Sequence, residues 1–400
     1  MKVIQINVVY DKGSTGTIMC NIHTELLNEG IESIICYGRG EKLFEKDLYK
    51  TCGELYSKIN NLASRITGLM YGGCFWSTGK LISIIKKLRP DVVHLHCLNG
   101  YFVNIYRLVS WLKKRKIKTV LTLHAEFMHT ANCGHAFECD KWLDGCGKCP
   151  RLKQETKSIL FDRTHNSWMR MKKAFDGFET ITAVSVSPWL GERAKRSPIL
   201  KDAKHITILN GLDTKKFCVN DSSELRKALG IKDEKVIFHA TPWFCNDIDN
   251  IKGGYYVLKL AEELRDRNIK IFVAGAYDES IKIPDNVIML GRVSDQTLLA
   301  RYYSMADVTV ITSKRETFSM IVAESLCCGT PVVGFEAGGP ESISIPEYSR
   351  FVKYGDTESL KNEVIRVLED EMPKAVVSRL ACDKYSKENM VKNYMEAYLN

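Results

Sequence analysis

The sequence predicts an α/β protein with two domains, each a doubly wound parallel sheet covered by helices. Short β-branched runs alternate with amphipathic helical segments over most of the chain, the pattern of strand–helix–strand units. The alternation breaks at Asn210-Gly211 and then starts again. A length of 400 residues, with 45% hydrophobic and 26% charged residues, suits two or three soluble domains. This composition excludes a disordered chain, a collagen and a coiled coil.

The first half begins with a strand, a glycine turn and a helix. Residues 3–9 are a short β-branched run, and Gly13-Ser14-Thr15-Gly16 follows as a turn. Ile18, Ile22 and Leu26 recur at helical spacing, which predicts a helix over 17–28. We likewise expect strands over 32–37, 91–96, 119–124, 181–185 and 205–209, and helices over 80–88 and 107–112. Residues 40–80 and 130–165 fit the alternation poorly, so loops with local helix are expected there.

The second half repeats the pattern after a boundary near residues 208–214. Strands are expected over 236–239, 270–274, 286–290, 308–312 and 331–335, and helices over 255–266, 296–304 and 316–328. Val391, Met395 and Tyr398 share one face of a final helix over 388–399, which we expect to pack back on the first domain. The predicted domains are residues 1–208, joined by that helix, and residues 209–387.

The chain carries signals of its location and partners. Gln5 and Asn7 interrupt the apolar run at the start, and no run reaches 18 apolar residues, so neither a signal peptide nor a membrane span is expected. The 14 Cys residues are mostly scattered along a long chain, which favours free thiols in a reducing cytoplasm. Residues 1–200 have a charge balance of +12 and residues 201–400 one of −3.

The basic first half suggests an anionic partner, although a solvated surface would look the same. Basic stretches lie at 86–89, 113–116 and 170–173, with Trp111 and Trp168 near two of them. This mix favours peripheral contact with an anionic membrane. No nucleic-acid motif accompanies it.

Two domains of this kind predict a nucleotide-bearing ligand in a cleft at the carboxyl ends of both sheets. The dinucleotide fingerprint G-x-G-x-x-G does not follow the first strand, which counts against a dehydrogenase. Glu316 ends one predicted strand, and Glu324 lies farther along the next helix. The backbone N–H groups that begin such a helix bind phosphate, and each carboxylate accepts two hydroxyl donors. Two solvated carboxylates would give the same spacing.

The surrounding motifs carry a resemblance to the retaining glycosyltransferases of family 4, which have the GT-B fold. That family has a pattern like E-x-F-x-x-x-x-x-E-x-x-x-x-G-x-P-V-V, and this chain has Glu316, Phe318, Glu324, Gly329, Pro331, Val332 and Val333. The run Gly338-Gly339-Pro340-Glu341 resembles the family's glycine pair and following acid. Upstream, the motifs at 306–308, 210–217 and 252–253 match its A-D-V, N-G-V-D-x-x-x-F and K-G. The resemblance spans nearly the whole chain.

The resemblance implies roles for residues of the second domain. Glu316 would contact the transferred sugar, Glu324 the ribose hydroxyls, and Lys252 the donor diphosphate, unless Lys252 is only an exposed helix-start lysine. The family's phosphate-binding Arg is missing from residues 239–243, so Thr241 is expected to bind phosphate instead, or Lys252 to act largely alone. The remaining donor-site residues are the base neighbours Arg292 and Val293 and the start of the helix at Thr317, Phe318 and Ser319.

The resemblance extends to the first domain. The turn with Gly13, Ser14 and Gly16 resembles the family's glycine loop near the diphosphate or acceptor, although a plain strand–helix turn is the alternative. His124 would face the donor sugar. Ala125 stands where many relatives have Asp, and Glu126 follows it as a possible substitute. His96 and Asn99 match a motif that would line the acceptor side, though strand-end histidines are often structural.

Four cysteines gather in one glycine-rich segment. Cys133, Cys139, Cys146 and Cys149 have the spacing C-x5-C-x6-C-x2-C, and similar loops occur in capsule and exopolysaccharide transferases that resemble this chain. Four thiolates would hold a structural Zn²⁺ with no open position for catalysis, and free or paired thiols are the alternative.

The sequence thus predicts a retaining transferase that uses a UDP- or GDP-linked sugar and needs no cofactor for the reaction. It would extend a saccharide or polyprenyl-linked acceptor at the cytoplasmic face of the inner membrane during surface-polysaccharide synthesis. A non-catalytic binding subunit and a sugar-nucleotide epimerase of the same fold are the alternatives.

Overall fold

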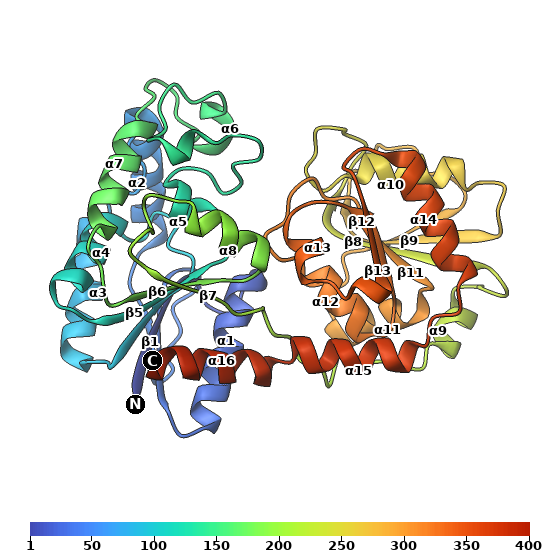
Figure 1. The fold of residues 1–400 in the computed structure, drawn as a ribbon, viewed down its shortest axis with the longest axis horizontal. Coiled ribbons are helices and arrows are strands. Elements are labelled where there is room, and N and C mark those ends of the chain that lie inside the picture. The colour runs from blue at the N-terminus through green and yellow to red at the C-terminus, as the bar shows by residue number, and fades with distance from the viewer. The chain divides into compact units, whose positions relative to one another are not determined.

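The computed structural model describes all residues, 1–400, and they form two compact units. One unit comprises Met1–Leu209 and Met390–Asn400, and the other comprises Asn210–Asn389. Each unit is a parallel sheet between helices (Figure 1). The predicted fold class is therefore confirmed.

The first unit has a seven-stranded sheet in the order β3-β2-β1-β4-β5-β6-β7, and all neighbouring strands are parallel. The strands are β1 (Lys2–Val9), β2 (Glu32–Arg39), β3 (Leu48–Lys50), β4 (Val92–Leu95), β5 (Lys118–Leu123), β6 (Ile181–Ser185) and β7 (Lys204–Thr207). Its longer helices are α1 (Gly13–Asn28), α2 (Glu54–Thr67), α3 (Phe75–Leu88), α4 (Ile105–Lys114), α7 (Thr164–Phe175) and α8 (Pro188–Lys195). Short helices lie at α5 (Phe127–Thr130), η1 (Lys141–Leu143) and α6 (Leu152–Glu155).

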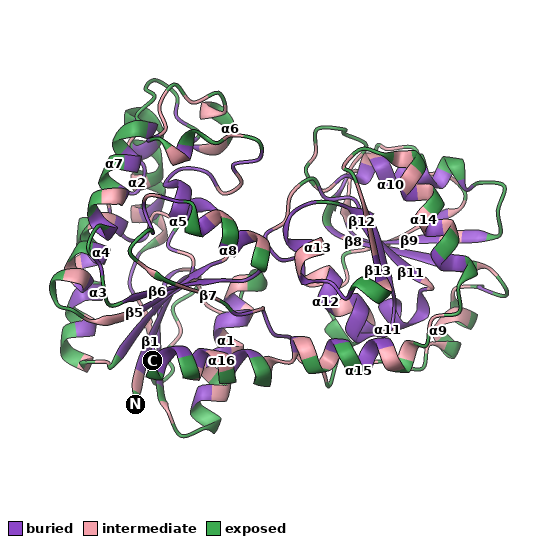
Figure 2. Ribbon diagram, viewed as in Figure 1, coloured by how far each residue is buried: buried purple, intermediate pink, exposed green.

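The central strands are buried on both faces, as expected of a parallel sheet between helix layers (Figure 2). Their β-branched and aliphatic side chains pack against Ile18, Ile22 and Leu26 of α1. The predicted helix stripe is therefore the buried stripe.

The last helix, α16 (Lys387–Leu399), contributes Met390, Val391, Tyr394 and Tyr398 to the core of the first unit. The Tyr398 hydroxyl lies 2.7 Å from Nδ1 of His94 in β4. The Tyr394 hydroxyl lies 2.9 Å from the Thr122 hydroxyl in β5. The C-terminal helix is thus anchored to the sheet by polar as well as apolar contacts.

The second unit has a six-stranded sheet in the order β10-β9-β8-β11-β12-β13, again parallel throughout. The strands are β8 (Lys235–Phe244), β9 (Ile269–Tyr277), β10 (Val287–Gly291), β11 (Val308–Ile311), β12 (Val332–Phe335) and β13 (Ser349–Val352). The helices are α9 (Ser223–Ala228), α10 (Gly254–Glu263), α11 (Gln296–Met305), α12 (Met320–Cys327), α13 (Gly339–Ile343), η2 (Pro346–Tyr348), α14 (Thr357–Glu369) and α15 (Lys374–Tyr385). In both sheets the chain reverses its strand order beside the first strand of the unit, which leaves a crevice at the carboxyl edge.

One predicted helix boundary is wrong. We expected a helix over 316–328, but α12 begins at Met320. Ser319 has φ +77°, a left-handed backbone that no helix accommodates, so residues 316–319 form a loop instead. Glu316 is therefore held by loop contacts and not by a helix.

Residues 40–80 contain more regular structure than their pattern indicated, namely β3, α2 and the start of α3. Residues 130–165 are mostly loop with the short helices η1 and α6, as expected. None of the helices is both long and apolar enough to cross a membrane.

Candidate functional site

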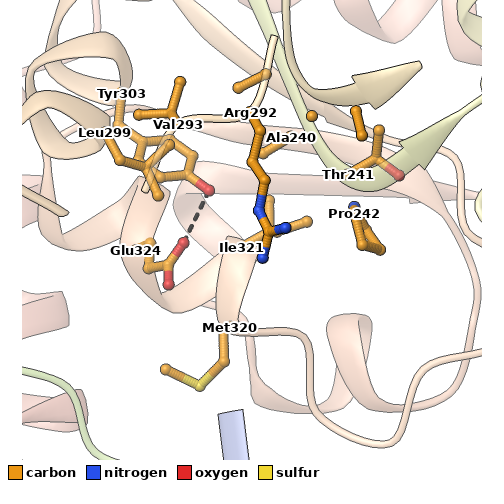
Figure 3. A pocket seen from close by; sticks show the side chains of 13 residues that line it. Ala240, Thr241, Pro242, Arg292, Val293, Leu299, Tyr303, Met320, Ile321 and Glu324 are labelled. Atoms are coloured by element: carbon orange, nitrogen blue, oxygen red, sulfur yellow. Dashed lines mark hydrogen bonds between the residues drawn. The ribbon is translucent and has the colours of Figure 1, made fainter. Parts of the chain in front are cut away.

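A cavity of about 420 Å³ lies at the carboxyl edge of the sheet of the second unit (Figure 3). Its walls come from the ends of β8 and β9, the turn after β10, and the helices α11 and α12. The predicted donor residues Thr241, Arg292, Val293 and Glu324 all line it. The carboxyl edge beside a topological switch is where open α/β sheets bind ligands.

Glu324 is the acidic side chain in the wall of this cavity. Its carboxylate accepts a hydrogen bond of 2.9 Å from the hydroxyl of Tyr303, which comes from α11 (Figure 3). Burial raises the pKa of Glu324 to about 7, and the hydrogen bond from Tyr303 partly offsets that rise. A carboxylate placed this way can accept hydroxyl donors from a ligand once it is ionised.

The start of α12 offers further polar groups. The hydroxyl oxygen of Ser319 is buried without a partner, and no side chain caps the helix there. Met320 and Ile321, which begin the helix, line the same cavity as Glu324. Unsatisfied N–H groups and a positive helix end favour an anion at this point.

Glu316 is clamped by the loop after β12. Its backbone N–H donates to the Ala337 carbonyl at 3.0 Å, and its carbonyl accepts from the Gly339 N–H at 2.8 Å. The Glu341 carboxylate accepts hydrogen bonds from the N–H groups of Ala337 and Gly338. The glycine pair is needed here, because a Cβ on Gly339 would lie 2.4 Å from the Thr317 carbonyl carbon.

The two predicted catalytic groups of this unit, Lys252 and Glu316, are in direct contact. The Lys252 ammonium donates to the Glu316 carboxylate at 2.6 Å, and both side chains are partly accessible. Gly253 makes this approach possible, since its φ is +71° and a Cβ there would lie 2.1 Å from the Thr312 carbonyl oxygen. The two charges therefore neutralise each other in this structure.

Residues 239–243, where the expected Arg is missing, lie in the bulged carboxyl end of β8. The β8–β9 register shifts between Ala240 and Trp243, and the Thr241 hydroxyl donates to the Trp243 carbonyl at 3.0 Å. His239 is buried, its Nδ1–H donates to the Val310 carbonyl at 2.9 Å, and burial lowers its pKa to about 4. The Arg292 side chain, in contrast, extends into the cavity and toward the first turn of α12 (Figure 3).

Not every predicted donor residue lines the cavity. Thr317, Phe318 and Ser319 are all buried just before α12. Phe318 packs its ring against Tyr385 at a centroid distance of 6.4 Å, so its side chain supports the loop.

In the first unit, three histidines form a row at the ends of β4 and β5, and His94 and His96 of this row are buried. Nδ1 of His96 lies 3.2 Å from Nε2 of His124, and Nε2 of His96 lies 3.1 Å from the Gln5 side-chain oxygen. His94 is tied to Thr122 and to Tyr398 of α16. Burial lowers the pKa of His124 to about 4, so its imidazole is neutral at pH 7.

His96 itself is 1% exposed. It therefore supports His124 from behind, and this geometry does not support the expectation that its side chain lines an acceptor surface. Asn99 is exposed after β4.

The predicted glycine loop begins α1. Gly13 has φ +66°, and a Cβ on Gly16 would lie 3.2 Å from the Asp11 backbone nitrogen. Gly13 and Ser14 are exposed, and no side chain caps the helix. A second cavity, of about 190 Å³, lies beside the loop and is lined by residues such as Tyr10, Lys12 and Arg39.

Glu126 does not fit its predicted place on the acceptor side. It is 0% exposed, pairs with Arg193 at 2.6 Å, and accepts from the Ala136 N–H at 2.8 Å. Burial opposes its ionisation, but hydrogen bonds and charge from His129 and Arg193 hold its pKa at about 2. Its carboxylate is engaged in fastening the loop after β5 to α8.

The four clustered cysteines line one small pocket together with Trp142 and Pro150. No group of three or more His, Cys, Asp or Glu side chains in the structure is arranged to hold a metal ion, however. Burial raises the pKa of Cys146 to about 12, which keeps its thiol protonated. The four cysteines line the same pocket, as their spacing suggested, and a structural zinc stays a prediction.

Sequence reasoning missed Tyr303, Glu341 as a clamp, and the apolar lining residues Ala240, Pro242, Gly275, Leu299, Met320 and Ile321. Leu299 and Tyr303 lie four residues apart and therefore share one face of α11. This spacing could have indicated that both side chains line the same surface.

Comparisons with known proteins bear directly on this site. Residues 221–389, which contain the cavity, match the family model described as glycosyl transferases group 1. Residues 221–389 form a group 1 glycosyltransferase domain.

The whole chain is similar to WcaC of Escherichia coli strain K12, provisionally named a colanic acid biosynthesis glycosyl transferase. The two are 22% identical over 425 residues, with 100% of each covered. Among solved structures, sucrose-phosphate synthase from Thermosynechococcus elongatus has a TM-score of 0.67 at 16% identity, covering 99% of this chain and 98% of that one. HepE of Anabaena in complex with UDP-glucose has a TM-score of 0.64 at 13% identity, covering 99% and 98%. These likenesses confirm the predicted GT-B fold.

Proposed function

We propose that this protein is a retaining hexosyltransferase that moves a sugar from a nucleoside-diphosphate sugar to a saccharide acceptor. The observation that carries the proposal is the cavity of the group 1 domain, with the Glu324 carboxyl on its wall and the start of α12 beside it. Similarity to HepE, which was solved with UDP-glucose, supports a donor of this class.

In the proposed complex each part of the donor meets a matching group. Glu324 accepts hydrogen bonds from the ribose hydroxyls, Val293 contacts the base, and the N–H groups of the first turn of α12 bind phosphate oxygens. The unpartnered Ser319 hydroxyl supports a phosphate at this point, because a buried hydroxyl is costly without a partner.

Two cations complete the proposed phosphate site. Lys252 is one, and Arg292 is the second, because its side chain extends into the cavity toward α12. Arg292 thereby takes the place of the Arg that is absent from residues 239–243. A guanidinium binds phosphate oxygens in pairs, so this arrangement restores the missing charge.

The Lys252–Glu316 pair suggests how the reaction site is prepared. A bound diphosphate attracts Lys252 and releases the Glu316 carboxylate, which then accepts hydroxyl donors from the transferred sugar. The bond between the anomeric carbon and the diphosphate oxygen breaks while Lys252 and the α12 N-terminus stabilise the leaving charge. The acceptor hydroxyl attacks the anomeric carbon from the same face and its proton passes to the leaving diphosphate oxygen, so the anomeric configuration is retained. The neutral imidazole of His124 is proposed to face this sugar.

The acceptor is proposed to be a polyprenyl-linked saccharide of a surface polysaccharide, bound at the cytoplasmic face of the inner membrane. Full-length similarity to WcaC supports polysaccharide synthesis. The cavity of about 190 Å³ beside the Gly13–Gly16 loop supports an acceptor site in the first unit. No metal is proposed to act in the transfer.

Product stereochemistry tests this proposal. UDP- and GDP-linked sugars are incubated with the purified chain, and nucleoside diphosphate release and the anomeric configuration of the product are followed by NMR. We expect release with retention, and loss of release in Glu316→Gln but not in the exposed control Glu369→Gln. Inversion would contradict the mechanism. Release unaffected by Glu316→Gln would contradict the site, and absence of release from every donor would favour a non-catalytic binding subunit.

A further inference from the structure

Helix α2 (Glu54–Thr67) presents its apolar side to solvent. Leu55, Ile59, Leu62 and Ile66 recur at helical spacing and are 72%, 56%, 54% and 42% exposed. The only buried residues of this helix are Ser57 and Ser64. An amphipathic helix on a soluble domain normally buries its apolar stripe, so α2 is inverted.

Hydrogen bonds fix α2 in this orientation. The hydroxyl of Ser57 donates to the Gly100 carbonyl at 3.0 Å, and that of Ser64 donates to the Leu69 carbonyl at 2.9 Å. The Asn60 side-chain oxygen accepts from the Cys74 N–H at 2.8 Å. The polar side of the helix is therefore satisfied within the first unit, and rotation of the apolar side inward would break these bonds.

Neighbouring segments enlarge the exposed apolar surface. Trp76, 81% exposed at the start of α3, stacks on Tyr56 of α2 with ring centroids 5.7 Å apart, and Phe75 beside it is 56% exposed. At the other end of α2, the Ile159 N–H donates to the Arg65 carbonyl at 2.8 Å. We call the α2 face the set Leu55, Ile59, Leu62, Ile66, Phe75, Trp76, Ile159, Leu160 and Phe161, all of them more than two-fifths exposed. Contiguous apolar patches of this kind mark interaction surfaces.

The charge around the α2 face is positive. Lys58 and Arg65 lie along one flank of the apolar row of α2, and Lys157 and Arg163 flank the 159–161 segment; all four are exposed. The acids nearby already have partners. The Glu54 carboxylate accepts hydrogen bonds from Arg39 and from the Gly40 N–H.

Asp162, the other acid in these segments, accepts from the Cys149 N–H and from Thr164. The four cations beside the apolar row are therefore available to bind an external negative charge.

We propose that the α2 face docks on an anionic lipid membrane, with α2 lying in the plane of the headgroups. Aliphatic and aromatic side chains then enter the acyl boundary while Lys58, Arg65, Lys157 and Arg163 meet lipid phosphates. A lipid surface is favoured because the four exposed cations that border this apolar row all carry positive charge, which is complementary to lipid phosphates. The exposure and charge of the α2 face support this proposal whether or not the protein catalyses the proposed transfer.

This surface is distinct from the basic stretches that predicted membrane contact. Lys86 and Lys87 lie in the last turn of α3, at the opposite end from Phe75 and Trp76. Lys113 is engaged with the carbonyls of Lys173 and Asp176. The structure therefore assigns docking to an apolar face that sequence charge did not reveal.

Vesicle co-sedimentation of the full chain tests the proposal, with phosphatidylcholine vesicles and mixed phosphatidylcholine–phosphatidylglycerol vesicles. We expect binding to the mixed vesicles that is weakened by salt. The triple variant Leu55→Gln/Ile59→Gln/Leu62→Gln should reduce partitioning at least roughly 100-fold. Lys58→Gln/Arg65→Gln should reduce it roughly 30-fold at low salt. The matched control is Leu380→Gln on α15, 42% exposed in the second unit, which should bind as the wild type does.

Two further readouts make the result decisive. Circular dichroism and thermal unfolding show whether each variant is folded, and mixed vesicles should shift the Trp emission of the wild type to the blue more than that of Trp76→Phe. No binding of the folded wild type to mixed vesicles would overturn the proposal, as would equal binding by the triple variant. Self-association of the lipid-free wild type that the triple variant abolishes would show a protein interface instead.

Discussion

At the scale of single residues, the ionisation of Glu324 connects the site to pH. Its pKa of about 7 in the folded protein lies above the usual 4.5 of a glutamate, because burial disfavours the charged form. The unliganded fold therefore gains stability from this group below pH 4.5 and loses that gain as pH rises through 7. Ribose binding needs the opposite, ionised form.

We therefore expect nucleoside diphosphate affinity to fall up to about tenfold per pH unit below pH 7, as one proton must be released on binding. Glu324→Gln should remove this pH dependence. Tyr303→Phe should move its midpoint to higher pH, because the Tyr303 hydrogen bond lowers the pKa of Glu324. Titration calorimetry across pH measures both. A Tyr303→Phe profile that coincides with the wild type would show that Tyr303 is only a packing residue.

The Lys252–Glu316 ion pair makes a prediction that separates catalysis from folding. Glu316→Gln frees Lys252 from its carboxylate partner at 2.6 Å, so nucleoside diphosphate should bind as tightly as in the wild type or several-fold tighter. Transfer should nevertheless fall about 100-fold or more, since the sugar loses its charged acceptor. Binding and turnover are measured on the same preparation, with Glu369→Gln as control. Weakened binding together with lost stability would point to a structural role.

At the scale of elements, close approach of β8 and β9 shapes the cavity. Gly275 has φ +151°, and a Cβ there would lie 2.0 Å from the Thr241 carbonyl oxygen. Gly275→Ala should therefore destabilise the second unit by about 2 kcal/mol or more and weaken nucleotide binding.

Gly230→Ala is the matched control, because its φ is +64° but nothing lies within 4 Å of the added Cβ. It should cost about 1 kcal/mol and leave binding unchanged. Chemical denaturation of the three proteins measures the difference. Equal costs would mean that backbone strain, and not the clash with Thr241, limits the site.

Helix α16 makes a second prediction at this scale. Tyr398→Phe removes the partner of a buried His94 nitrogen, which should cost about 1–3 kcal/mol of stability in the first unit. Leu399→Ala, on the 72% exposed neighbour, should cost almost nothing. Thermal unfolding compares them. A harmless Tyr398→Phe would show that apolar contacts alone anchor the helix.

For the whole molecule, periodicity predicted most strands of both parallel sheets, because buried strands and half-buried helices leave different spacings in the sequence. It did not predict the short edge strands β3 and β13. It was misleading where local chemistry overrode the pattern. The left-handed Ser319 delays α12 to Met320, and the inverted α2 buries serines where a soluble helix buries leucines. The family resemblance indicated Glu316, Glu324 and Lys252, but not Tyr303, whose contact depends on how α11 packs against α12. Glu126 was misjudged because its ion pair with Arg193 joins residues 67 positions apart.

The central claim, that the cavity of the second unit binds a nucleoside-diphosphate sugar, is tested most directly by thermal unfolding with UDP, GDP, ADP and CMP, each in excess. A ligand at about 100 times its Kd adds roughly 2.7 kcal/mol to the stability of the folded protein. We predict that one nucleoside diphosphate raises the Tm of the wild type and of Glu369→Gln, and that Glu324→Ala loses this increase. A wild type that none of the nucleotides stabilises, or a Glu324→Ala variant that is stabilised equally, would contradict the claim.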